Sequence, residues 1–175
     1  NTMSTNFQNQ DSPFSANGRF GRLSYLGWNM LLGLVLVLIV TSVILVEPNL
    51  IIYMKDSMTS MIFFGILYLI VIYFSLIFTI RRLHDLDQSG WLSLVTLIPV
   101  INLFFFLYLI FAPGTQGSNN YGAPRMTKTW EKVLGWMYGL VPILGILAAI
   151  SLPAYQSYVE RAKLQQIEQQ VNQSE

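Results

Sequence analysis

The stretch SMTSMIFFGILYLIVIYFSLIFTIRRLHDLD, residues 57–87, places 24 uncharged residues directly before five charged or titratable side chains. A bilayer core about 30 Å thick is crossed by roughly 20 apolar residues, each of which adds 1.5 Å along a helix. Residues 57–80 are therefore predicted to cross a membrane as a helix. The charged block at 81–87 is predicted to lie where that helix leaves the bilayer.

Three further stretches carry no formal charge: residues 23–46, 88–124 and 133–159. Each contains a run long enough to cross a bilayer. Only 11% of the residues are charged, whereas about a quarter are charged in a typical soluble domain. The sequence therefore predicts an all-α membrane protein, a small polytopic bundle of four transmembrane helices. Their expected bounds are about 23–46, 59–80, 91–112 and 133–152.

Composition divides the chain into three parts. Residues 1–17 are polar and rich in turn formers, and we expect a disordered N-terminal tail there. Residues 18–124 carry the first three spans, and residues 125–175 carry the fourth span and a polar helical tail. Four crossings with a cytoplasmic N-terminus place six of the ten Lys and Arg residues inside. This count favours both termini in the cytoplasm.

Pro99 lies near the centre of the third expected span. Proline has no N–H, so in an α-helix it leaves the carbonyl four residues earlier, at Val95, without its partner. We expect the nearby Thr96 and Asn102 side chains to help satisfy that carbonyl.

The densest polar cluster of the chain follows the second span. On a helix, Asp85 is within reach of Arg81 or Arg82, and the other guanidinium is expected to bind anionic lipid headgroups of the bilayer. One interpretation is an anchor that fixes the topology. The alternative is a functional cytoplasmic corner in which His84 titrates near neutral pH. The cluster comprises Arg81, Arg82, His84, Asp85, Ser89, Gly90 and Trp91.

Two other groups of residues are candidates for anchoring and packing. A basic and aromatic anchor opens the first span, and it consists of Arg19, Arg22 and Tyr25. The fourth span contains small residues with spacings of three and four positions, which let helix backbones approach closely. They are Gly135, Gly139, Gly145, Ala148 and Ala149. Residues 133–159 are therefore a candidate surface for a membrane-protein partner.

Several function classes lack candidate residues. The sequence has no Cys and a single His, too few ligands for a metal site, and no catalytic set or basic block for nucleic acid. The expected spans contain no ionisable side chain except Tyr, which argues against a coupled transporter. We expect a non-enzymatic structural or accessory subunit that acts through helix packing, without cofactor or metal. A small transporter or channel component is the alternative.

The polar residues around the first three spans resemble those of a known family. They are Gly18-Arg19-Phe20-Gly21-Arg22-Leu23-Ser24-Tyr25, then Arg81-Arg82-Leu83-His84-Asp85 with Ser89-Gly90-Trp91, then Pro99, and finally the loop residues Pro113, Gly114, Thr115, Gly117, Asn119, Asn120, Tyr121 and Gly122. Over residues 18–124 the chain resembles the family called domain of unknown function 805, the YhaH/YhaI type. The resemblance implies a multi-pass protein of the bacterial inner (plasma) membrane with no assigned activity. One departure is Asn120, where the family usually has a basic residue.

The segment GILAAISLPAYQSYVERA, residues 145–162, resembles the middle of the N-terminal helix of type IV pilins. The pilin processing site is missing, because Glu131-Lys132 stand at the cleavage pair and Trp136 stands at the essential Glu. One interpretation is a helix that only packs in the bundle. The other is an accessory factor of a type IV pilus or secretion system that binds pilin-like helices.

Overall fold

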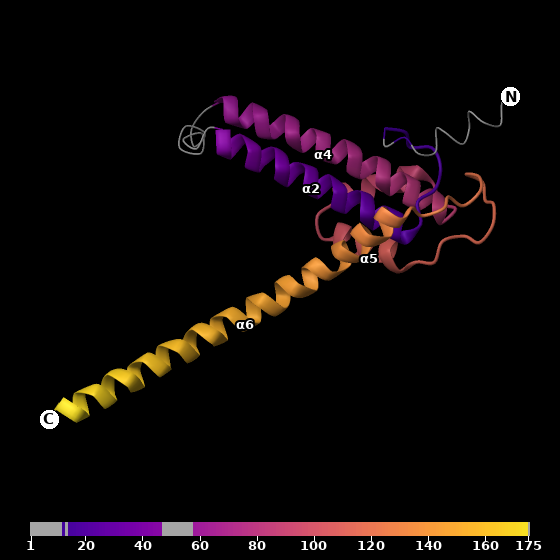
Figure 1. Cartoon of the computed structure of the whole chain (residues 1–175). Helices are drawn as coiled ribbons and strands as arrows, with labels where there is room; N and C mark the ends of the chain where they lie inside the picture. The colour runs from indigo at the N-terminus through magenta and orange to yellow at the C-terminus, as the bar shows by residue number, and fades with distance from the viewer. Residues whose placement is uncertain (1–11, 13, 47–57, 175) are drawn as a thin grey trace. The chain divides into compact units, whose positions relative to one another are not determined.

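The computed structural model describes residues 12, 14–46 and 58–174, which form helices and loops (Figure 1). The helices are α2 (Arg22–Val46), α4 (Met58–Asp85), the 3-10 helix η1 (Gly90–Leu97), α5 (Ile101–Phe111) and α6 (Thr129–Ser174). Three of them contain segments long and apolar enough to cross a membrane, Arg22–Val46, Ser60–Asp85 and Thr129–Ile167. The prediction of an all-α membrane protein is confirmed.

The chain divides into two units, Asn1–Tyr138 and Gly139–Glu175. The second unit, taken by itself, is a stretch of helix α6 that continues through Pro142 and Pro153. The boundary differs from the expected division at residue 124, because residues 125–138 pack with the first unit.

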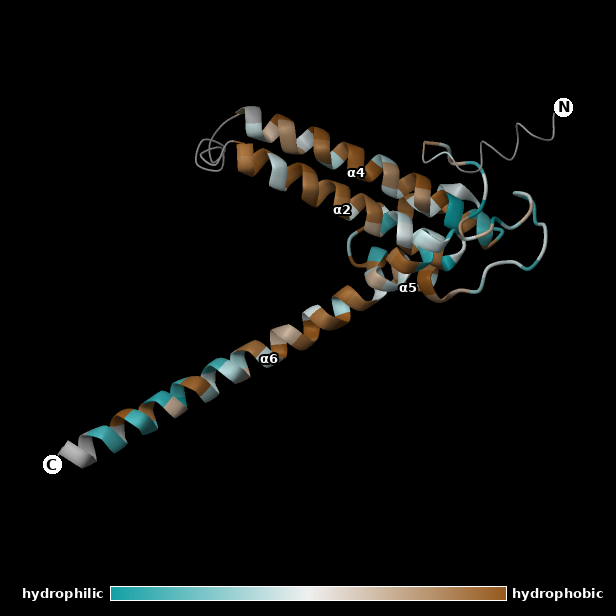
Figure 2. Ribbon diagram, in the orientation of Figure 1, coloured by the Kyte–Doolittle hydropathy of each residue, from teal (hydrophilic) through white to brown (hydrophobic). Residues whose placement is uncertain are grey.

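Helices α2 and α4 lie side by side in the first unit (Figure 1). The beginning of α2 lies beside the end of α4, where the Phe20 N–H donates to the Arg81 carbonyl at 2.9 Å. Figure 2 shows hydrophobic residues along both helices and hydrophilic residues at this shared end. We call this end, residues 18–24, 81–90 and 112–131, the polar corner.

The N-terminal segment is described only at residue 12 and from residue 14 onward. The Phe14 and Phe74 ring centroids are 5.6 Å apart, and the Ser12 carbonyl accepts a hydrogen bond from Arg81 at 3.2 Å. These residues therefore contact α4. The rest of the tail expected to be disordered, residues 1–11 and 13, lies outside the described residues.

The third expected span differs from a continuous helix. Its first part is η1, eight residues long, and its second part is α5, eleven residues long. At about 2.0 Å per residue for a 3-10 helix and about 1.5 Å for an α-helix, each part is about 16 Å long. That is about half of a 30 Å bilayer core. Neither part is long enough to cross alone.

Both ends of the η1–α5 segment lie at the polar corner. At its start, a Cβ on Gly90 would be 3.3 Å from Nε2 of His84. At its end, the Ala112 carbonyl accepts a hydrogen bond from Arg82 at 2.5 Å. The segment therefore leaves the corner and returns to it as a hairpin of two short helices.

The break between η1 and α5 is a strained turn at Val100. Its φ is 70° and its ψ is −54°, and the Ile101 N–H donates to the Pro99 carbonyl at 2.9 Å. This is a γ-turn of the rare form, and positive φ is especially unfavourable for a β-branched residue. Pro99 begins the break because it has no N–H to continue η1.

The expected role of Val95 at this break needs correction. In a 3-10 helix the acceptor lies three residues before the donor, so Pro99 deprives Thr96, and the Val95 carbonyl accepts from Ile98 at 3.1 Å. The Thr96 hydroxyl donates to the Ser93 carbonyl at 2.6 Å. The backbone N–H of Asn102 donates to the Ile98 carbonyl at 2.9 Å.

Candidate functional site

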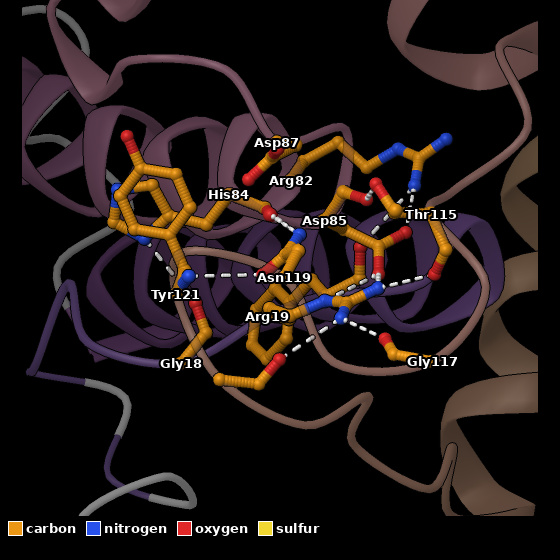
Figure 3. A network of polar contacts seen from close by, with 12 residues as sticks. Gly18, Arg19, Arg82, His84, Asp85, Asp87, Thr115, Gly117, Asn119 and Tyr121 are labelled. Carbon is orange, nitrogen blue, oxygen red and sulfur yellow. Dashed lines mark hydrogen bonds and ion pairs between the residues drawn. The ribbon is translucent and has the colours of Figure 1, made fainter.

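A buried ionic group of three side chains lies at the centre of the polar corner (Figure 3). The two oxygens of the Asp85 carboxylate are 3.0 Å from Nη2 of Arg19 and 2.5 Å from Nη1 of Arg82. Both guanidinium side chains are fully buried, and Asp85 is 7% exposed. Arg82 and Asp85 are three residues apart on α4, a spacing that brings side chains together on one helix face. Arg19 joins them from the segment before α2.

The other donors of Arg19 bind the loop that follows α5. Its guanidinium donates to the carbonyls of Thr115 at 2.6 Å, Gly117 at 2.7 Å and Gly122 at 3.0 Å. An arginine has five N–H donors in a fixed plane, so one side chain can hold several carbonyls at once. Arg19 therefore fastens the loop to the start of α2.

The donors of Arg82 bind the end of α5. They reach the carbonyls of Leu109 at 2.8 Å and Ala112 at 2.5 Å. The last carbonyls of a helix have no intrahelical partner and carry partial negative charge, so a cation is favourable there. Arg82 thus caps the end of α5 and holds it at the corner.

The conformation of the loop depends on its glycines. A Cβ on Gly114 would overlap the Asp85 carboxylate, and Gly117 and Gly122 have φ of 75° and 105°. The Asn119 side chain donates to the His84 carbonyl at 2.7 Å. The loop motif and the cluster after the second span, which are distant in sequence, therefore form one structure. Pro113 opens this loop and is exposed.

His84 is stacked on Tyr121 in the same corner (Figure 3). The ring centroids are 3.8 Å apart and the planes differ by 8°. Nδ1 of His84 lies 3.3 Å from the Gly18 carbonyl. The imidazole is thus held between the loop and the segment before α2.

Asn120 has a defined contact although it departs from the family pattern. Its side-chain amide donates to the Asp87 carboxylate at 3.1 and 3.2 Å, and the site is exposed. A basic residue at position 120 would form an ion pair with the same carboxylate. Asn120 therefore forms hydrogen bonds to Asp87 where a basic residue would form an ion pair.

Arg81 and Arg82 have no exposed surface. The Arg81 guanidinium lies over the Phe20 ring, 3.8 Å from its centroid, a favourable cation–π geometry. Arg82 is bonded to Asp85 and to carbonyls of α5. This burial argues against the expected direct contact of either guanidinium with lipid phosphates.

The other predicted anchor residues have separate positions. Arg22 is exposed, and Tyr25 is buried with its ring 6.3 Å from that of Phe106. The Ser89 hydroxyl caps η1 by accepting from the Trp91 N–H at 3.4 Å. Trp91 is 81% exposed.

Close backbone contact between α2 and α6 involves two glycines. A Cβ on Gly135 would be 2.7 Å from the Leu23 carbonyl oxygen, so this predicted packing residue does allow close approach. Gly27 was not predicted, and a Cβ there would be 2.5 Å from the Glu131 carbonyl oxygen. The predicted packing residues Gly139, Gly145, Ala148 and Ala149 lie in the second unit, where their role stays a prediction.

A second buried charge at Glu131 was missed by the sequence analysis. Its carboxylate accepts two hydrogen bonds from Arg125 at 2.9 and 2.7 Å, one from Trp28 at 2.9 Å and one from Ser24 at 2.9 Å. It also accepts the Lys128 N–H at 3.0 Å. A Glu at the third position of a helix that bonds the amide before the helix is half of a capping box. Lys128 stands at the N-cap position, so the full signature is absent, and the available signal was an acidic residue in the first turn of α6.

The two carboxylates are thus neutralised by arginines and bonded on several sides. Within residues 12, 14–46 and 58–174, no cluster of three or more His, Asp or Glu side chains could hold a metal ion. The arrangement ties four chain segments together: the start of α2, the end of α4, the loop after α5 and the start of α6.

The chain is similar in sequence to two inner membrane proteins of Escherichia coli. The Escherichia coli (strain K12) inner membrane protein YhaI is 38% identical over 61 residues, which cover 34% of this chain and 52% of YhaI. Inner membrane protein YhaH of the same organism is 43% identical over 42 residues, which cover 24% of this chain and 35% of YhaH. The chain thus matches about half the length of one relative and about a third of the other.

No solved structure matches the chain. The names of the two relatives place them in the inner membrane and describe no enzymatic activity. The family model described as protein of unknown function, DUF805, matches residues 13–123. These residues contain both arginines of the Asp85 group, the η1–α5 segment and the loop, and the chain belongs to this family of inner-membrane proteins of unknown function.

Proposed function

We propose that this protein is a non-enzymatic inner-membrane subunit that acts through helix packing, with the polar corner as its rigid part. The observation that supports this most is the use of the charged side chains. Arg19, Arg82 and Asp85 direct their hydrogen bonds at one another and at backbone carbonyls. A catalytic group needs to be within reach of a substrate, whereas these groups are buried and bonded to the chain.

The proposal includes a membrane topology in which the chain crosses the bilayer three times. Helices α2, α4 and α6 cross the membrane, and the η1–α5 segment enters from the polar corner and returns to it. Seven of the ten Lys and Arg residues then belong to the corner side: Arg19, Arg22, Arg81, Arg82, Arg125, Lys128 and Lys132. Because basic residues accumulate on the cytoplasmic side, the corner is cytoplasmic. The residues after the α6 crossing are then on the periplasmic side.

This topology replaces the expectation that both termini are cytoplasmic. Four crossings put six of the ten basic residues inside, and three crossings put seven inside. Three crossings also direct residues 145–162 from the cytoplasm outward, which is the direction of the pilin helices that they resemble.

Reporter fusions test the topology. Alkaline phosphatase, which is active only outside the cytoplasm, is fused after residue 175 and, in a separate chain, after Gly122 in the loop. We expect activity from the first fusion and none from the second. An inactive enzyme at the C-terminus, with a fluorescent protein active there, would show that α6 does not cross outward.

Helix α6 is the proposed surface for a membrane-protein partner. Ala148 and Tyr155 are exposed in the second unit, and the small residues around them would let a partner helix approach closely. Photo-crosslinking amino acids at these two positions are expected to capture one defined membrane protein in cells. The control is the same amino acid at Ile66 on α4, which is 55% exposed. Equal capture from Ile66 would refute a specific surface on α6.

A further inference from the structure

A cavity of about 680 Å³ lies in the first unit at the turn of the re-entrant segment. It is lined by residues of α2, α4 and α5, by the Pro99–Val100 break and by Tyr138. Of its lining residues, Asn29 is seven residues from the start of α2 and Ser75 is ten residues from the end of α4. At about 1.5 Å per residue, these positions are about 10 and 15 Å from the polar corner. The cavity is therefore inside the hydrocarbon layer of the proposed topology.

The wall of the cavity is polar on one part and apolar on another. Its polar part includes the amides of Asn29 and Asn102 and the hydroxyl of Ser75. Its apolar part includes Leu97 and Leu103, which are 51% and 61% exposed. Exposed leucines at the rim indicate that the cavity opens sideways, toward lipid. None of the lining residues is an Asp, Glu, Lys, Arg or His.

The broken helix adds polar backbone groups to this wall. Thr96 and Val100 both line the cavity. The Thr96 carbonyl lacks the N–H that Pro99 cannot supply. The Val100 N–H donates to no acceptor within the described part of the chain. Backbone groups without partners are unfavourable in hydrocarbon, and irregular backbone at membrane depth is tolerated where it is buried in protein or lines a filled cavity.

We propose that this cavity binds an uncharged single-chain amphiphile, of the monoacylglycerol kind. Its hydroxyl and ester groups hydrogen-bond to Asn29, Ser75 and Asn102, and its acyl chain lies along Leu97 and Leu103. The volume is within the range of about 300–1,000 Å³ that is usual for small-molecule sites. A charged head is disfavoured because no ionic partner lines the site, and an isolated charge is costly away from water.

The proposal rests on the membrane depth that the three-crossing topology gives to the cavity. The test uses the purified full chain in detergent and a monoacylglycerol that carries a photoreactive diazirine in its acyl chain. After illumination, the labelled peptides are identified by mass spectrometry. We expect labels on residues of the cavity wall. The same probe with a phosphate head is expected to label at least tenfold less.

Variants decide whether the label reports this cavity. Ser75→Phe fills the space and is expected to reduce labelling at least tenfold. The matched control is Gly65→Phe on the same helix, where an added Cβ meets no atom within 4 Å, and full labelling is expected. Asn102→Leu, at an exposed position, removes one polar partner of the ligand and is also expected to reduce labelling. This variant provides the test if Ser75→Phe does not fold.

Two results would overturn the inference. Equal labelling of the Ser75→Phe and Gly65→Phe variants would show that the probe binds elsewhere. Equal labelling by the charged and uncharged probes would show that the site does not select an uncharged head. The alkaline phosphatase fusions report on topology independently, so failure of one proposal is distinguishable from failure of the other.

Discussion

Replacing Asp85 with Asn tests the ionic group of the polar corner most directly. The substitution keeps the shape of the side chain and removes the negative charge between Arg19 and Arg82. Removal of one partner from a buried ion pair costs about 3–5 kcal/mol, because the other charge is left without compensation. Here two buried cations lose the same carboxylate, while both keep their bonds to backbone carbonyls. We therefore expect a loss of about 4 kcal/mol in the free energy of unfolding.

The assay is reversible unfolding in mixed micelles as the fraction of denaturing detergent is raised. The control is Asp87→Asn, two residues away, where the carboxylate is exposed and bonds to Asn120. An exposed polar or ionic contact contributes about 0–1 kcal/mol, so this variant should unfold nearly as the wild type does. If the two variants differ by less than about 1 kcal/mol, the buried ionic group does not hold the corner together.

A double-mutant cycle adds a second check on the same group. Arg82→Gln alone removes one cation, and Arg82→Gln with Asp85→Asn removes the pair. Residues in direct contact show coupling energies of about 0.5–3 kcal/mol. We expect the double variant to lose less stability than the sum of the single losses. Additivity within about 0.3 kcal/mol would contradict a direct interaction.

Three further predictions concern stability and use the same unfolding assay. Gly27→Ala should cost about 1–3 kcal/mol because its Cβ would lie 2.5 Å from the backbone of α6; Gly33→Ala, whose Cβ meets no atom within 4 Å, should cost nothing. Val100→Gly should stabilise by about 1 kcal/mol, because relief of about 1–3 kcal/mol of strain exceeds the added chain entropy of about 0.5–1 kcal/mol; an unchanged or lower stability would contradict a strained turn. Asn120→Lys should add at most about 1 kcal/mol through an ion pair with Asp87, and a gain that persists in high salt would refute that cause.

The membrane fold was predictable because it depends on local composition. The expected span at 23–46 agrees with α2 at both ends within one residue, whereas the expected span at 59–80 agrees with α4 only at its start, and α4 continues to Asp85. It continues because Arg82 and Asp85 pair along the same helix face. The charged block was expected to lie on a helix where the second span ends, and residues 81–85 do form the last turn of α4.

The third span could not be predicted from length and hydropathy. Residues 91–112 are apolar and numerous enough to cross, and Pro99 alone is compatible with a kinked span. What turns the segment back is the bonding of the Leu109 and Ala112 carbonyls to Arg82. Those partners are 27 and 30 residues apart in sequence, and no periodic pattern reports such a contact.

The residues of the site could be predicted only in part, because the contacts that bring them together are also long-range. The motifs at 81–85 and 113–122 were recognised, but their contacts with each other and with Arg19 are long-range features. Glu131 had a local signal in its position at the start of α6. Gly27 had none, because only the approach of a second helix distinguishes it from Gly33.

The polar corner and the cavity have a common physical origin. A re-entrant segment must bring two helix ends to one side of the membrane and leave irregular backbone at its turn. Arg82 holds the end of α5 at the corner through hydrogen bonds to its last carbonyls, and Arg19 forms similar bonds to the carbonyls of the following loop. The irregular backbone at the turn remains incomplete within the described residues, since the Thr96 carbonyl and the Val100 N–H have no hydrogen-bond partner there. The two buried carboxylates of the corner are thus paired with arginines, whereas the backbone groups of the turn are left to be completed by a molecule bound in the cavity.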